Sequence, residues 1–102
     1  MQKNNKIKLN QNQINIINLF KNYLNNYYLN KNNYISQNSI KHRITQLKFL
    51  INNPKSQYNK TDQPSLNHTL YLFTKFSNTL TTNKQKHTYL NLLIQITSNI
   101  NK

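Results

Sequence analysis

Five basic residues between positions 41 and 60 are the side chains of this sequence best suited to chemistry with a partner: Lys41, Arg43, Lys48, Lys55 and Lys60. Ammonium and guanidinium groups neutralise phosphate, and no acidic residue lies between them. Arg43 is the only arginine of the chain, and its planar fork suits a bidentate phosphate or a stacked base. We therefore expect these five residues to neutralise phosphates of a partner, the alternative for each being a merely solvated basic face.

The charge of the whole chain supports an anionic partner. Fourteen Lys and Arg residues stand against a single acid, which gives a formal net charge of +13 over 102 residues. Like charges repel in a compact protein, and a basic surface kept for solubility normally includes interspersed acids. A polyanion resolves the imbalance, and nucleic acid is the commonest one.

The same composition argues against an enzyme. Asp62 is the only carboxylate, and Cys and Gly are absent, so general acid-base chemistry, thiol catalysis and a Gly-rich phosphate loop lack their residues. His42, His68 and His87 fall on different predicted elements with no carboxylate or thiol beside them. We expect no zinc site, no cofactor and no small-molecule substrate.

The order of elements predicts an α+β fold. Alternation with a period of two predicts strands over 6–10, 34–51, 66–73 and 89–97. Apolar spacings of three and four predict a helix over 14–29, with Asn12 as its N-cap, and a short, weak helix over 75–83. The sequence β-α-β-β-α-β is the ferredoxin-like arrangement of two helices on an antiparallel sheet. We predict one small domain over 1–102, with residues 98–102 as a frayed tail.

The segment from Ser39 to Tyr58 is the centre of this prediction. Arg43, Thr45, Leu47 and Phe49 alternate with Ile44, Gln46 and Lys48, as on the two faces of a strand. Asn52, Asn53 and Pro54 predict a turn, which makes residues 40–72 a long protruding hairpin with a polar tip. At its tip, Tyr58 either stacks on a base or packs under the loop.

Several short motifs, in order along the chain, resemble the universal small-subunit ribosomal protein S-ten family. KIKLN at the start is similar to the first strand of the family, and Lys41 to Leu47 (KHRITQL) is similar to its K-x-R-[FI]-T-x-L strand. Residues 53–58 (NPKSQY) look like a shortened hairpin-tip motif, although the Ser-Pro-His and the acids of the family's tip are missing. His68 with Leu70 and Leu72 falls at the T-H-L-R-L position, and residues 92–97 (LLIQIT) resemble the closing strand.

This resemblance implies a structural protein in the head of the small ribosomal subunit, with a role in translation. Its partners would be the 3′ major domain of the small-subunit rRNA and the neighbouring head proteins three, nine and fourteen. The long hairpin of the family would bind the RNA. Carried over residue by residue, the RNA-binding set is Lys41, Arg43, Lys48, Asn53, Lys55, Ser56, Gln57, Tyr58, Lys60 and His68.

Composition also suggests a compartment. Roughly a fifth of the residues are Asn, far above the usual share, and with abundant Lys, Ile and Tyr this bias is typical of A+T-rich organelle genomes. We expect a mitochondrial protein, made where it works. No apolar run is long enough to cross a bilayer, so no membrane partner is expected.

Two alternatives remain open at the level of the sequence. The aromatic face of the helix over 14–29 would serve a protein-interaction subunit of an organellar complex as its docking surface. Residues 72–85 (LFTKFSNTLTTNKQ) are faintly similar to the entry helix of another small-subunit protein, that numbered seven.

Overall fold

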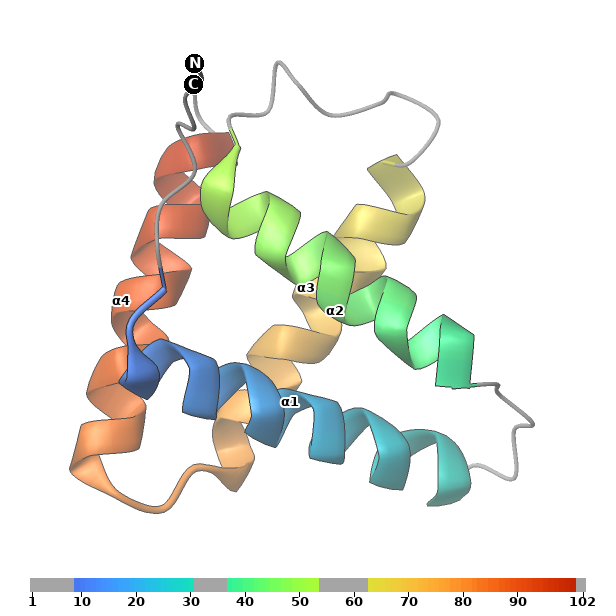
Figure 1. Ribbon diagram of the computed structural model, residues 1–102, viewed down its shortest axis with the longest axis horizontal. Helices are drawn as coiled ribbons and strands as arrows, with labels where there is room; N and C mark the ends of the chain where they lie inside the picture. The colour runs from blue at the N-terminus through green and yellow to red at the C-terminus, as the bar shows by residue number, and fades with distance from the viewer. Residues whose placement is uncertain (1–8, 31–36, 54–62, 101–102) are drawn as a thin grey trace.

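The computed structural model describes residues 9–30, 37–53 and 63–100, and within these residues it contains helices and no strand. In chain order the elements are α1 (Gln11–Asn30), α2 (Gln37–Asn52), α3 (Gln63–Phe76), a 3-10 turn (Ser77–Thr79) and α4 (Asn83–Ile100). α2 passes across α3, and α1 and α4 flank this crossing (Figure 1). α4 packs against α1 and α2, and α3 packs against the same two helices. The described chain is therefore a helical bundle with crossed axes.

The predicted ferredoxin-like α+β fold is wrong. The central strand of that prediction is α2 from Gln37 onward, the strand over 66–73 lies within α3, and the strand over 89–97 lies within α4. The protruding hairpin is also wrong wherever the structure describes it, because residues 40–52 and 63–72 are helical. Its tip, with Lys55, Ser56, Gln57, Tyr58 and Lys60, lies outside the described residues, as does nearly all of the strand predicted over 6–10.

The burial pattern of α2 shows why the strand assignment failed. Gln46 and Leu47 are neighbours in sequence and both are buried, and the same is true of Leu50 and Ile51. Neighbouring residues of a strand point to opposite faces, whereas pairs that recur every three to four residues share one face of a helix. Ile40 extends this stripe about two turns before Leu47.

The other two misassigned segments follow the same rule. In α3 the buried side chains include Leu66, Thr69, Leu72, Phe73 and Phe76, and in α4 they include Tyr89, Leu92, Ile96 and Asn99. These spacings of three and four are helical. The alternation of apolar residues that predicted strands is present in the sequence, but it does not match the buried face.

The helix predicted over 14–29 is confirmed as part of α1, and its start is fixed by a capping box. The backbone N–H of Gln13 donates to Asn10 Oδ1 at 2.9 Å, and the N–H of Asn10 donates to Gln13 Oε1 at 3.0 Å. Each side chain thereby satisfies a backbone donor at the helix start. The N-cap is Asn10 and not Asn12.

The separate short helix predicted over 75–83 is wrong: residues 75–76 are the end of α3, the 3-10 turn and residues 80–82 form the connection, and residue 83 already begins α4. After the 3-10 turn, Leu80 adopts an extended backbone with φ −76° and ψ 136°, which ends the helical run. A second capping box then starts α4, because Gln85 N donates to Thr82 Oγ1 at 3.1 Å and Gln85 Oε1 accepts from Thr82 N at 3.4 Å. α4 continues to Ile100, so residues 98–100 are not the frayed tail that was predicted.

Aromatic rings from three helices meet in the core. The ring centroid of Phe20 in α1 lies 5.3 Å from that of Phe73 and 5.4 Å from that of Phe76, both edge to face. Tyr89 of α4 closes the cluster, 4.8 Å from Phe73. Such pairs contribute about 0.5–1.5 kcal/mol each beyond the area they bury. The cluster thus fixes α1, α3 and α4 around one point.

Amide side chains of α4 join it to the end of α2. Asn99 Nδ2 donates to the carbonyl oxygens of Ile51 at 2.7 Å and Leu50 at 3.1 Å, and Gln95 Nε2 donates to the carbonyl of Ile51 at 2.9 Å. The last four carbonyls of a helix have no partner within that helix. α4 therefore provides the C-terminal cap of α2.

Candidate nucleic-acid interface

The described basic residues are spread over all four helices and face no acidic side chain. Those that are exposed are Lys21, Lys41, Lys48, Lys75, Lys84 and Lys86, and Arg43 is half-buried. The only acid of the chain, Asp62, lies outside the described residues. Within the described part, no carboxylate side chain compensates these charges, which leaves them available to an anionic partner.

Two of the predicted RNA contacts share an exposed face of α2. Lys41 and Lys48 are seven residues apart, which is close to two helical turns, and exposed Thr45 lies between them. Asn53, another predicted contact, follows the end of α2, where its side-chain Nδ2 donates to the carbonyl of Phe49 at 3.2 Å. Asn53 therefore caps the C-terminal end of α2.

Arg43 is tied into a polar cluster between α2 and α3. Its Nη1 donates to the carbonyl oxygen of Ser65 at 2.9 Å and to Thr69 Oγ1 at 3.0 Å, with longer contacts to Ser65 Oγ at 3.3 Å and Gln46 Oε1 at 3.4 Å. Thr69 Oγ1 donates to Gln46 Oε1 at 2.6 Å, and Gln46 Nε2 donates to Ser65 Oγ at 2.8 Å. Gln46 and Thr69 are buried. One nitrogen of Arg43 is thus committed to holding two helices together.

An open hollow of about 330 Å³ lies against the start of α2 and is lined by Asn38, Ser39, His42 and Arg43. Neither Nε nor Nη2 of Arg43 bonds to a described residue. The guanidinium can therefore serve two roles, packing α2 on α3 through Nη1 and presenting its remaining donors to an anion.

On α3, an exposed strip of three residues combines two rings and a cation; we call His68, Tyr71 and Lys75 the α3 strip. The rings of His68 and Tyr71 are nearly parallel, with centroids 6.1 Å apart and planes at 20°. Lys75 Nζ lies 5.5 Å from the centroid of the Tyr71 ring. Tyr71 is 50% exposed, a large fraction for an aromatic side chain. Exposed rings interleaved with cations are what single-stranded nucleic acids stack on.

The pKa of His68 links the α3 strip to Arg43. Burial, and then the positive charge of Arg43, lower the pKa of His68 below its ordinary value of 6.5. The neutral imidazole is therefore favoured at neutral pH. In that state His68 offers a stacking surface and a hydrogen-bonding edge to a partner, and the neighbouring cations supply the charge.

Tyr23 of α1 is coupled electrostatically to the α3 strip, and Tyr27 of the same helix packs beside Tyr23. Burial, and then Tyr27, raise the pKa of Tyr23, while the charge of Lys75 opposes this rise. The rings of Tyr23 and Tyr27 are roughly parallel, with centroids 6.0 Å apart. Phe20, Leu24 and Tyr28 of the same helix are buried in the core. Two of the four aromatic residues of this helix are therefore internal, and of the two that are partly buried Tyr23 lies near the α3 strip.

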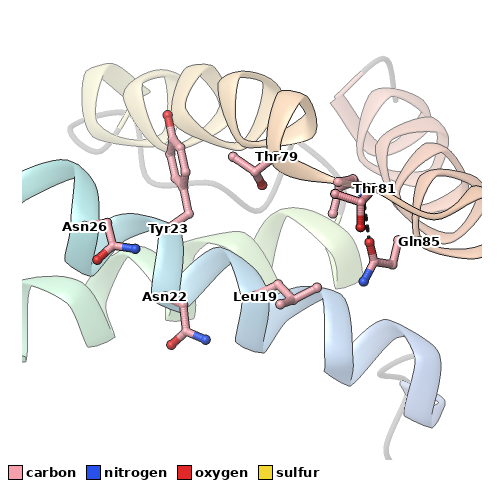
Figure 2. Close-up of a pocket in the computed structure, with 8 residues that line it drawn as sticks. Leu19, Asn22, Tyr23, Asn26, Thr79, Thr81 and Gln85 are labelled. Carbon is pink, nitrogen blue, oxygen red and sulfur yellow. Dashed lines mark hydrogen bonds between the residues drawn. The ribbon is translucent and has the colours of Figure 1, made fainter.

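A groove runs between α1 and the α3–α4 connection, and we call it the α1 groove. Figure 2 shows its first hollow, of about 310 Å³, and the side chains that border it: Asn22, Tyr23 and Asn26 from α1, Thr79 and Thr81 from the connection, and Gln85 from α4. A second hollow, of about 210 Å³, shares Leu19 and Gln85 with the first and is bordered by Asn15 and Lys84. The groove is lined by amides and hydroxyls over an apolar floor.

The sequence predictions include some of the residues of this candidate interface. They name Arg43 and His68, which the structure brings close together, and Lys41 and Lys48, which share a helix face. They miss Tyr71, Lys75 and the α1 groove. The signal for the α3 strip was the spacing of three and four from His68 to Tyr71 and Lys75, which places these residues on one face only if the segment is helical.

The described residues offer no arrangement for metal chemistry. They contain no group of three or more His, Cys, Asp or Glu that would hold a metal ion. His42, His68 and His87 lie on α2, α3 and α4, and the ring of His87 contacts the Asn91 amide at 3.4 Å. In the same residues no helix is long and apolar enough to span a membrane.

Comparison with known proteins identifies no relative. No protein-family model, no curated protein and no solved structure matches this sequence. The interface described above therefore rests on the residues and geometry of this chain.

Proposed function

We propose that this chain is an RNA-binding protein that serves as a structural component of a ribonucleoprotein particle. The observation that carries the proposal is the α3 strip, in which an exposed tyrosine lies between a histidine ring and a lysine. Base-aromatic stacking contributes about 1–3 kcal/mol per base, and it does not depend on base identity. Phosphates of the same strand would supply the negative charge that the described surface lacks.

The positive charge around the α3 strip extends the proposed interface onto α2. Arg43 and His42 border the hollow at the start of α2, and Arg43 acts on His68 electrostatically. A strand whose bases lie on Tyr71 would thus have cationic or hydrogen-bonding partners for its phosphates on both helices. RNA is preferred over DNA because the chain resembles a ribosomal protein in several short motifs.

We propose the small ribosomal subunit of a mitochondrion as the particle, with its rRNA as the partner. The support for this is the order of those motifs and the organelle-like composition of the chain. The hairpin of the S-ten family is not part of the proposal, because its residues are helical wherever the structure describes them. The motif residues on α2 and α3 would meet RNA from helix surfaces.

Affinity for short single-stranded RNA, measured by fluorescence anisotropy, tests the interface. Tyr71→Ala is expected to weaken binding by about five- to a hundredfold, since it removes one stacking platform. Leu90→Ala is the matched control, because Leu90 is similarly exposed, at 51%, on α4. Equal loss in both variants, or none in either, would contradict a role for the α3 strip.

Sedimentation of organelle lysate on a gradient tests the particle. The proposal expects the native protein to migrate with the small subunit and to leave that position after ribonuclease treatment. Migration with a membrane complex, unchanged by ribonuclease, would favour a protein-interaction subunit instead.

A further inference from the structure

The α1 groove contains hydrogen-bonding groups that the fold does not use. Asn22 and Asn26 make no side-chain hydrogen bond within the described residues, and the same holds for the Nε2 group of Gln85. Gln85 Oε1, in contrast, accepts the backbone N–H of Thr81 at 3.1 Å and of Thr82 at 3.4 Å. Because this capping contact fixes the amide, its Nε2 donor is held in a defined orientation at the groove.

The floor of the groove is apolar and partly aromatic. Leu19 and Leu80 line it, and the Tyr23 side chain stands between α1 and α3, as Figure 2 shows. An apolar floor with amide donors and acceptors around its edge suits a flat, polar-edged heterocycle. Asn and Gln side chains are well suited to the hydrogen-bonding edges of nucleobases.

A lysine borders the second hollow of the α1 groove. The second hollow adjoins the first through Leu19 and Gln85, and exposed Lys84 borders it. Lys84 lies in the first turn of α4, beside the Gln85 amide. A base in the first hollow would thus be followed by a basic group that can neutralise the phosphate of the same strand.

From these observations we propose that the α1 groove is a second RNA site, which takes an unpaired nucleobase in its first hollow and the adjoining phosphate at Lys84. This inference rests on the proposed function and deepens it. Duplex RNA keeps its bases paired and stacked, so the groove selects single-stranded segments. Tyr23 borders the groove and is linked electrostatically to Lys75 of the α3 strip, which makes the two sites neighbours.

The test compares two leucine variants of α1. Asn22→Leu combined with Asn26→Leu removes the amide edge of the groove while keeping side chains of similar size and favourable helix propensity. Asn18→Leu is the control, because Asn18 is exposed on the same helix and lines neither hollow. Fluorescence anisotropy with a short single-stranded RNA of mixed sequence, and with a fully paired duplex of the same composition, measures the affinity of each variant.

The groove variant is expected to lose about five- to tenfold in affinity for the single strand, while its affinity for the duplex and the binding of the control stay unchanged. Equal binding by the groove variant and the control would overturn the groove site and leave the α3 strip in place. An unmodified protein that binds neither RNA would overturn both proposals.

Photo-crosslinking of the unmodified protein gives a second readout that does not depend on a variant folding. Single-stranded RNA containing 4-thiouridine is expected to crosslink to peptides that contain Tyr23 or Thr81. Crosslinks confined to peptides outside the groove would overturn the proposed site.

Discussion

Asn99 donates its side-chain N–H to the carbonyl oxygen of Ile51 at 2.7 Å, and this bond joins two helices whose contacting residues are 48 positions apart. Asn99 is only 9% exposed, and it reaches the carbonyl of Leu50 as well. Roughly a fifth of the residues of this chain are Asn, and most of them have no such interhelical contact among the described hydrogen bonds. This one fixes the position of α4 against the end of α2.

Asn99→Ala is expected to lower the free energy of unfolding by about 1–3 kcal/mol, because it removes the buried amide that donates to the carbonyls of Leu50 and Ile51, although Gln95 still donates to the carbonyl of Ile51. Chemical denaturation followed by circular dichroism measures the loss. Asn18→Ala, at an exposed position of α1, should be neutral or slightly stabilising, since Ala is the better helix former. Similar values for the two variants would show that the contact contributes nothing to stability.

Thr69→Val tests the polar cluster of α2 and α3. Valine keeps the shape of threonine but removes the hydroxyl that bonds Gln46 Oε1 at 2.6 Å and accepts from Arg43 at 3.0 Å. The expected cost is about 1–3 kcal/mol of unfolding free energy, because both partners lose a bond in a buried setting. Thr97→Val is the control, since the Thr97 hydroxyl is exposed and bonds only within its own helix. A Thr69→Val variant with the same free energy of unfolding as the unmodified protein would show that the polar cluster does not stabilise the packing of α2 on α3.

His68 provides a test of pH dependence. Its folded-state pKa lies below 6.5 through burial and through Arg43, so the folded state favours the neutral ring. The stability linked to His68 is therefore present above its unfolded pKa and is lost as the pH falls through the lower folded value. NMR titration of the His68 ring protons should give a midpoint below 6.5, and Arg43→Gln should raise it. A midpoint that does not move in the variant would exclude the influence of Arg43.

Lys75→Gln tests the charge of the α3 strip. If Lys75 neutralises one phosphate, the slope of log affinity against log salt concentration should become shallower by about 0.7–0.9. Lys86→Gln is the control, because Lys86 is exposed on α4 and belongs to neither the strip nor the groove. Anisotropy titrations at several salt concentrations give both slopes, and identical slopes would remove Lys75 from the interface.

The helix α1 could be predicted because the apolar residues of its sequence follow helical spacing and do not alternate like those of a strand. Phe20, Tyr23, Leu24 and Tyr27 are spaced by three and four, and polar residues fill the other positions. In α4, by contrast, Leu90, Leu92, Ile94 and Ile96 alternate like the face of a strand. The structure separates them, with Leu92 and Ile96 at 0% exposure and Leu90 and Ile94 at 51% and 65%. Alternation was misleading there because two of the four residues do not belong to the core.

The same error hid part of the candidate site. In a strand His68 and Tyr71 lie on opposite faces, whereas three residues apart on a helix they share one. The net positive charge could be read from the sequence without knowing the fold, whereas the faces on which side chains lie could not. The role of Arg43 in joining α2 to α3 could not be predicted from the sequence, because its partners Ser65 and Thr69 are more than twenty positions away.

The polar contacts between the described helices are hydrogen bonds among amides, hydroxyls, carbonyls and a single guanidinium. None of these contacts is an ion pair. Ionic strength therefore acts differently on the affinity of the chain for an anionic partner and on the stability of its fold. Salt screens the attraction between lysines and phosphates, but it has little to screen among neutral amides, and it also weakens the repulsion among the lysines. If the chain binds RNA as proposed, concentrated salt should release it from the RNA while leaving it folded, so that assembly becomes reversible without a cycle of unfolding.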